Sequence, residues 1–129
     1  MASIIEGCQL PFKIAFHCSV QFDSNSVYLI GGLQNESRSK KTWIVNPKDI
    51  NPNVQHWHHH SHVLKNIKKG PPLAVSREGA ACGKFSIGGR VFIVIAGGYQ
   101  EDSVELLDPL SDKGWILGKF QHYPQISTN

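Results

Sequence analysis

The sequence predicts an all-β protein built from two copies of one four-stranded unit. Two apolar runs, at residues 27–30 and 91–96, each end in a double glycine. Each double glycine is followed by a polar loop and then by a strand that stops at a proline. No stretch of ten residues or more has helical periodicity. A repeat of this kind predicts stacked sheets, because one unit cannot bury its own apolar face.

The first two strands of each unit form a predicted hairpin. In the first unit the leading strand starts near His17, and the turn composition at residues 23–26 separates it from the first apolar run. In the second unit the leading strand starts near Ala81, and residues 86–89 supply the turn. The apolar runs themselves are nearly continuous, which is typical of strands buried on both faces.

The third and fourth strands follow the polar loops. Pro47 and Pro109 stop the third strand, because proline cannot donate a hydrogen bond to the sheet. The fourth strand is expected near Gly70 and near Gly118, which lie 23 and 9 positions beyond those prolines. The first unit therefore holds an insertion of 14 residues. Without the insertion, the repeat period is close to ~50 residues.

The ordered set of repeated residues resembles kelch repeats. It comprises residues 28–32 (Tyr-Leu-Ile-Gly-Gly), residues 70–73 with Arg77, residues 93–99, residues 103–109, and Trp115 with Gly118. The first unit departs from the family pattern, since Ile67 stands at the position of Trp115 and the loop after Gly32 holds no tyrosine. The resemblance implies that Arg77 is structural and supports the connection between successive units.

The resemblance also implies a division of the chain. It predicts about two four-stranded antiparallel kelch blades of an incomplete β-propeller. Residues 1–12 would be the end of a preceding blade and a linker, residues 13–70 the first repeat, residues 71–118 the second repeat, and residues 119–129 a C-terminal tail. The histidine-rich insertion occupies about residues 48–66 of the first repeat.

The function implied by the resemblance is protein–protein interaction, with loops presented to a partner. Family members often recruit substrates for ubiquitin ligases as adaptors or contact the cytoskeleton. One alternative is a fragment of a propeller enzyme similar to galactose oxidase, but Tyr28, Tyr99 and Tyr123 do not show the copper-ligand arrangement that such an enzyme needs. Another alternative is a truncated product without independent function. No nucleophile, base and carboxylate stand in a catalytic pattern, so we expect no enzyme, no cofactor and no metal site.

Two sets of residues are the candidates for contact with a partner. His56, Trp57 and His58 lie in the insertion, where loops of a scaffold fold often carry binding residues. Arg38, Tyr99 and Glu101 lie in the loops after the two double glycines. The competing interpretation of both sets is ordinary solvated surface, since charged and polar side chains are mostly exposed in any protein. A histidine-rich tract can also bind metal, but a specific site needs a fixed geometry.

Composition narrows the classes of partner. The net charge is +3 and the basic residues are scattered, which does not favour nucleic acid. The sequence contains no run of 18 apolar residues that would predict a membrane span, and its N-terminus does not have the pattern of a signal peptide. We therefore expect a cytoplasmic protein. Propellers have about 4 to 8 blades, so two units predict a fragment, self-association or further blades that close the ring.

The cysteines are expected to be reduced. Cys18 and Cys82 occupy matching places at the start of the first strand of each unit. Matching positions on adjacent sheets lie about one sheet spacing apart, ~10 Å, which is more than the ~7 Å between Cα atoms that a disulfide tolerates. Buried, unpaired thiols would agree with a reducing compartment.

Overall fold

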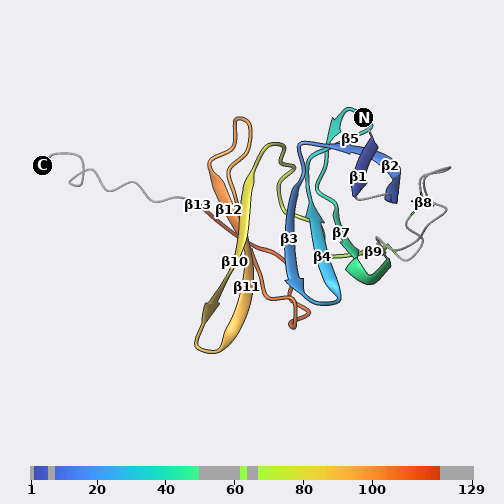
Figure 1. The fold of residues 1–129 in the computed structure, drawn as a ribbon. Coiled ribbons are helices and arrows are strands. Elements are labelled where there is room, and N and C mark those ends of the chain that lie inside the picture. The colour runs from blue at the N-terminus through green and yellow to red at the C-terminus, as the bar shows by residue number, and fades with distance from the viewer. Residues whose placement is uncertain (1, 6–7, 50–61, 64–66, 120–129) are drawn as a thin grey trace, which may run out of the picture.

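The computed structural model is a stack of three β-sheets, which confirms the all-β fold class (Figure 1). The structure describes residues 2–5, 8–49, 62–63 and 67–119. Within these residues the only helical element is one short 3₁₀ turn, η1 (Pro47–Asp49). None of the helices in this part of the chain is long and apolar enough to cross a membrane.

The second sheet contains the four strands that the sequence predicts for the first repeat. β3 (Cys18–Asp23), β4 (Ser26–Ile30), β7 (Thr42–Val45) and β9 (Lys68–Lys69) lie side by side in chain order and are antiparallel. The predicted turn joins β3 to β4, where the Asp23 carboxylate accepts a hydrogen bond from the Asn25 amide. The prediction that Pro47 ends the third strand is confirmed, since β7 stops at Val45.

The third sheet repeats this arrangement. β10 (Ala81–Ile87), β11 (Arg90–Ala96), β12 (Ser103–Leu107) and β13 (Ile116–Lys119) again follow one another in antiparallel order. The two central glycines of the β10–β11 turn have φ values of 57° and 80°, which suits a tight hairpin.

The first sheet lies on the other side of the second sheet. It contains β1 (Ala2–Ile5), β2 (Cys8–Ala15), β5 (Leu33–Gln34) and β6 (Ser37–Arg38), with β8 (His62–Val63) parallel to β2. The segment after Gly32 is therefore more than the loop predicted from sequence. Its central Asn35 and Glu36 have φ values of 52° and 68° and turn β5 back into β6 as a two-residue hairpin.

The main core lies between the second and third sheets. Alternate residues of β3, β4 and β11 face this core, and its buried members are Val20, Tyr28, Ile30, Leu73, Ile93, Ile95 and Leu107. Trp115 packs against the same cluster, and its indole Nε1 donates to Thr42 Oγ1 at 3.2 Å and to Pro71 O at 3.0 Å. The end of the second repeat is therefore bonded directly to the first.

A smaller core covers the opposite face of the second sheet. Ile14 of β2 packs there with Leu29 and Val45, all of them buried. The prediction of burial on both faces is thus confirmed for β4. It is wrong for β11 within the described residues, because only Ile93 and Ile95 are buried while Phe92 and Val94, which point to the opposite face, are partly exposed.

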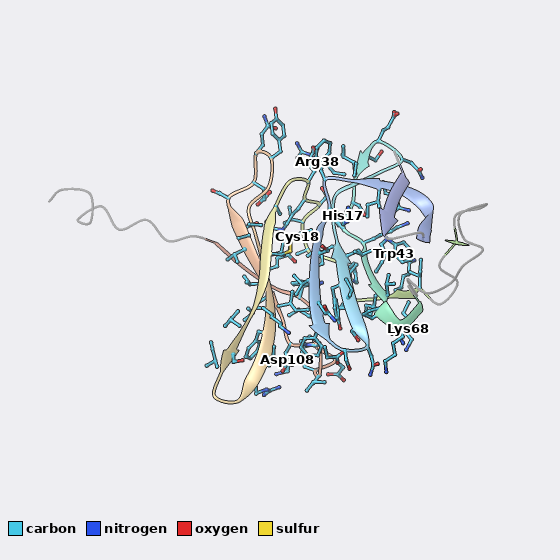
Figure 2. The ribbon with its side chains drawn as sticks, viewed as in Figure 1. His17, Cys18, Arg38, Trp43, Lys68 and Asp108 are labelled. Atoms are coloured by element: carbon cyan, nitrogen blue, oxygen red, sulfur yellow. A yellow bond between two sulfur atoms is a disulfide. The ribbon has the colours of Figure 1, made fainter. Side chains whose placement is uncertain are left out.

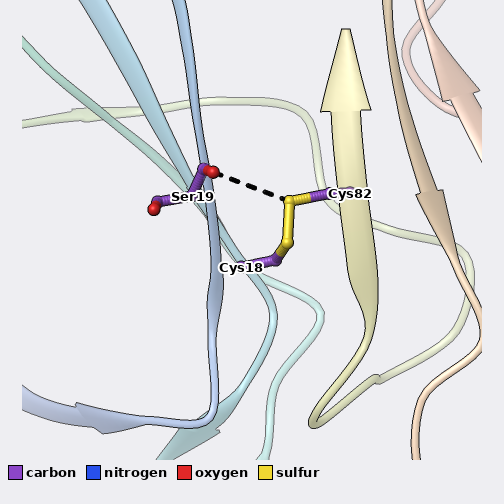
Figure 3. Close-up of a disulfide and its surroundings, with 3 residues drawn as sticks. All are labelled: Cys18, Ser19 and Cys82. Carbon is purple, nitrogen blue, oxygen red and sulfur yellow. Dashed lines mark hydrogen bonds between the residues drawn. A yellow bond between two sulfur atoms is a disulfide. The ribbon is translucent and has the colours of Figure 1, made fainter.

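The expectation of reduced cysteines is wrong for Cys18 and Cys82, which form a disulfide between the second and third sheets (Figures 2 and 3). Their Cα atoms are 6.1 Å apart, because β3 and β10 converge where the two sheets meet. The positions are also not equivalent. Cys18 pairs with Ile30, one residue before the double glycine, whereas Cys82 pairs with Ile95, two residues before it.

That shift of one residue explains why the sulfur atoms meet. Successive residues of a strand point to opposite faces, so the shift turns Cys18 toward the third sheet and Cys82 toward the second. Two equivalent residues would have pointed the same way. The disulfide also removes the premise of reduced thiols on which the cytoplasmic expectation partly depended, and that expectation stays a prediction.

Candidate functional site

Two of the residues predicted from sequence meet at one end of the stack. Arg38 comes from the first repeat and Tyr99 from the loop between β11 and β12 in the second. The Arg38 guanidinium lies over the Tyr99 ring at 5.3 Å from its centroid, within the range of a cation–π contact. The Arg38 Nε atom also donates to Glu78 Oε1 at 2.9 Å. We name Arg38, Glu78 and Tyr99 the loop-end surface.

The loop-end surface is accessible to a partner. The Tyr99 side chain is 62% exposed, and the Arg38 side chain keeps 36% of its surface despite its two contacts. An exposed aromatic ring beside an arginine combines two side chains that are enriched at binding hot spots. Arg38 lies at the same end of the molecule as β5 (Figures 1 and 2).

Backbone hydrogen bonds hold this surface in place. The Tyr99 amide donates to Glu78 O at 2.9 Å, and the Gly79 amide donates to Phe16 O at 2.9 Å. The segment that joins the second and third sheets thereby connects loops of both repeats. Tyr99 and Glu78, which belong to separate loops, are therefore fixed relative to each other.

The double glycine of the first repeat is required by close packing beneath the loop-end surface. Gly31 and Gly32 have φ values of 68° and 87°, a region that favours glycine. A Cβ atom on Gly31 would lie 2.8 Å from Arg77 O, and one on Gly32 would lie 2.6 Å from Ala15 O. The Gly32 amide donates to Arg77 O, so the close contact of the two backbones forms a hydrogen bond between the residues after β4 and the segment that joins the second and third sheets.

Glu101, the third predicted loop residue, faces a different partner. Its carboxylate accepts hydrogen bonds from the Ser103 hydroxyl and the Ser103 amide. The hydroxyl bond is the main cause that lowers the pKa of Glu101, with the positive charge of Arg77 a smaller contribution. The structure therefore does not bring Glu101 into the contact between Arg38 and Tyr99.

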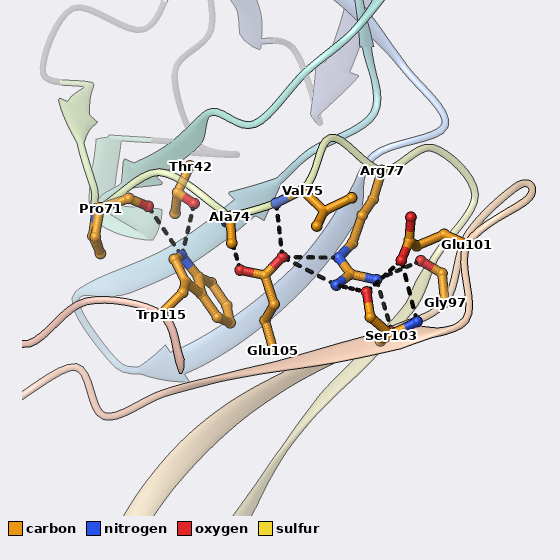
Figure 4. Close-up of polar contacts among 10 residues, drawn as sticks. All are labelled: Thr42, Pro71, Ala74, Val75, Arg77, Gly97, Glu101, Ser103, Glu105 and Trp115. Carbon is orange, nitrogen blue, oxygen red and sulfur yellow. Dashed lines mark hydrogen bonds and ion pairs between the residues drawn. The ribbon is translucent and has the colours of Figure 1, made fainter. Parts of the chain in front are cut away.

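Arg77 is buried and structural, which confirms the role expected for it (Figure 4). Its Nε and Nη2 atoms donate to Glu105 Oε2 at 3.1 and 3.0 Å. Its Nη1 atom donates to Gly97 O and Ser103 O, and Nη2 also donates to Ser103 Oγ. All five N–H groups of the guanidinium are thus used.

Glu105 completes this network, and sequence reasoning missed it. Its carboxylate also accepts hydrogen bonds from the Ala74 and Val75 amides, at 2.7 and 3.2 Å. The signal was in the alternation of β12, which places Glu105 on the same face as Leu107. A carboxylate on a buried face needs a cation as partner, and the sequence already indicated Arg77 as a structural residue that could pair with it.

A shallow polar groove runs beside Arg38. Its volume is about 320 Å³, and it is lined by Gln34, Asn35, Ser37, Arg38, Ser39, Lys40 and Lys41. Three of the lining residues are cations and none is an acid. Lys41 also lies 5.7 Å from the centroid of the Trp43 ring. The groove is suited to an anionic ligand rather than to an apolar one.

The other predicted contact residues fall outside the described structure. His56, Trp57 and His58 belong to residues 50–61, so their placement is not described. Among the described residues, no group of three or more histidine, cysteine, aspartate or glutamate side chains is arranged to hold a metal ion.

No protein-family model matches the chain, and no curated protein matches it at a significant level.

Proposed function

We propose that the second and third sheets are kelch-type blades of a β-propeller module. The support is the agreement between the sequence repeat and two four-stranded antiparallel sheets with the same strand order, packed face to face. Two of the residues that carry the resemblance link these sheets. Arg77, in the segment that joins them, donates to Glu105 of the third sheet, and Trp115 donates to Thr42 of the second sheet and to Pro71 of that segment. A closed ring would need further sheets besides the three described here.

We further propose that this module binds a protein partner through the loop-end surface. The observation that carries this proposal is the contact between Arg38 of the first repeat and the exposed Tyr99 of the second. A binding surface assembled from two repeats is fixed by the packing of the sheets, so little ordering entropy is lost when a partner binds.

The groove beside Arg38 favours a partner segment rich in acidic residues. Lys40 is exposed and lines the groove together with Arg38 and Lys41. Charge complementarity of this kind increases the association rate and selects against basic partners. The partner's aromatic or apolar side chains pack on the exposed Tyr99 ring. No catalytic role is part of this proposal.

Selection of ligands from a random peptide library displayed on phage tests the binding proposal. We expect peptides enriched in aspartate and glutamate, and a dissociation constant at least about tenfold higher for Arg38→Ala and Tyr99→Ser, corresponding to ~1.4 kcal/mol each. Lys48→Ala and Leu110→Ser are matched controls. Each makes the same kind of change at an exposed position beyond the opposite end of β7 or β12, and each should bind normally.

Two results would contradict the binding proposal. One is a failure to select any peptide whose binding depends on Arg38 or Tyr99. The other is selected peptides that bind all four variants equally, which would place the binding site elsewhere.

A further inference from the structure

The third sheet presents an apolar face that nothing covers in the described part of the chain. Its strands turn one set of residues toward the second sheet and the alternate set outward. The outward set, which we name the open face, comprises Phe85, Phe92, Val94, Val104, Leu106 and Ile116. The Phe85 and Phe92 rings stack at 5.7 Å, and Ile116 is 58% exposed. Figure 1 shows no other strand or helix beside this face.

The internal repeat identifies the open face as a surface that binds another sheet. Tyr28 and Ile30 stand three and one residues before the first double glycine, and Val94 stands three residues before the second. In the second sheet, Tyr28 and Ile30 are buried against the third sheet. The equivalent face of the third sheet has the same apolar character, and among the described residues it lacks the neighbour that the first repeat has.

The charges along the open face are complementary to those of a second copy. Arg90 begins β11, and Asp108 directly follows β12, so both lie at the same end of the sheet. Suppose that the open faces of two copies face each other across a twofold axis. The axis runs parallel to the strands, midway between the two sheets, and passes over the gap between β11 and β12. It places β11 of one copy opposite β12 of the other, and therefore Arg90 opposite Asp108 of the second copy. The two residues already form an ion pair within one chain, with Arg90 still 64% exposed.

The same axis also matches a protruding side chain with a hollow. Ile87 is 62% exposed at the tip of the β10–β11 hairpin. At the same end of the sheet, a hollow of about 180 Å³ is lined by Phe92, Leu106 and Ile116 together with Arg90 and Asp108. Because the axis places β10 opposite β13, Ile87 of each copy comes over the hollow of the other.

We propose that two copies of this chain associate through their open faces as a twofold dimer of sheets. A twofold arrangement buries both faces at once and leaves no free copy of the surface, so assembly stops at two chains. The sheets pack as an aligned sandwich, the arrangement that two twisted sheets with apolar faces commonly adopt. The inference depends on the described contacts of the third sheet and not on the loop-end surface.

Two neighbouring residues of β13 provide a matched test. Ile116 lies on the open face, whereas Leu117 pairs with Glu105 and faces the opposite side. Both are exposed in the single chain, at 58% and 45%, so a lysine at either position leaves the fold intact. We expect sedimentation equilibrium to give twice the 14.3 kDa chain mass for the unchanged protein and for Leu117→Lys. For Ile116→Lys we expect a dissociation constant about a hundredfold higher, because a charge would be buried in the interface.

A mixing experiment tests the predicted pairing of Arg90 with Asp108. Arg90→Asp gives an open face with two acids, and Asp108→Arg gives one with two bases. Each variant alone should be monomeric, and an equimolar mixture should form a one-to-one dimer, since every contact between copies then joins opposite charges. Far-ultraviolet circular dichroism of each variant checks that the sheets are retained.

Three results would overturn this inference. The unchanged chain could stay monomeric at every concentration used for sedimentation equilibrium, which would mean that a second copy does not bind the open face. Ile116→Lys and Leu117→Lys could dissociate equally, which would place the interface elsewhere. An open-ended mass distribution, or a mixture of the charge variants that stays monomeric, would exclude the twofold arrangement.

Discussion

Arg77 shows how one side chain joins two repeats of a small β protein. Its backbone belongs to the segment between the second and third sheets, while its guanidinium bonds to Ser103 and Glu105 of β12. Both partners of the ion pair have fully buried side chains. Such a pair adds little to stability compared with an apolar replacement of both residues, but removal of one partner leaves a buried charge without compensation.

Replacement of Arg77 should therefore be costly. We expect Arg77→Met to lower the free energy of unfolding by about 3 to 5 kcal/mol. Arg38→Met is the control, since the ion pair between Arg38 and Glu78 is exposed and such pairs contribute about 0 to 1 kcal/mol. Denaturant unfolding of both variants gives the comparison, and equal losses would show that the Arg77 network has no special weight.

His17 gives folding a dependence on pH. Burial lowers the pKa of His17 below the model-peptide value of 6.5, and its Nδ1 atom has no hydrogen-bond partner among the described residues. The folded protein therefore binds the proton less readily than the unfolded chain does. The contribution of His17 is fully present above pH 6.5 and is lost as the pH falls below that value.

We expect a lower midpoint of thermal unfolding at pH 5.5 than at pH 7.5, two values that lie about one unit from the ordinary histidine pKa. The difference between the two midpoints should be smaller in His17→Gln, because glutamine cannot titrate. Thermal unfolding monitored by circular dichroism at the two pH values checks this. A pH dependence that His17→Gln leaves unchanged would mean that other groups produce it.

At the scale of the elements, the strands of the two repeats were predictable and their exact register was not. Turn residues, double glycines and prolines mark the ends of β4, β7, β11 and β12, and those ends are where the sequence predicts them. Each of these signals acts through local backbone geometry. The sequence places Arg38 and Tyr99 in the loops after the two double glycines, and the contact between these two side chains is a finding of the structure.

The features that sequence reasoning missed depend on contacts between sheets. The leading strand of each repeat has no apolar run to fix its register, so a shift of one residue between Cys18 and Cys82 went unseen. The pairing of Arg77 with Glu105 spans 28 residues and needs the packed stack. The hairpin of β5 and β6 depends on Ala15 and Ile14 of β2, with which β5 pairs.

The disulfide between β3 and β10 should stabilise the contact between the two repeats. It closes a loop with a sequence separation of 64 residues, for which loss of chain entropy in the unfolded state predicts about 4 kcal/mol. We expect Cys18→Ala/Cys82→Ala to lose an amount of this order in denaturant unfolding, and the unchanged protein to lose a similar amount under reducing conditions. Cys8→Ser is the control and should keep the sensitivity to reductant.

In the whole molecule, the second and third sheets differ in how many of their faces are covered by another sheet. The second sheet has a core on both faces, against the first sheet and against the third. The third sheet has a core on one face and leaves Phe92, Leu106 and Ile116 uncovered in the described structure. A stack of repeats is stable to the extent that each sheet has two neighbours, so this face is where association or further sheets would complete the fold.

The two repeated sheets pack face to face, with β3 against β10. Disulfide mapping tests this packing most directly, by proteolysis of the unreduced protein and mass spectrometry of the linked peptides. The observed packing predicts a peptide pair that joins Cys18 to Cys82. A link from Cys8 to either of them, or Cys18 and Cys82 thiols that stay free after the folded protein is exposed to a mild oxidant, would contradict the packing of the two repeats described above.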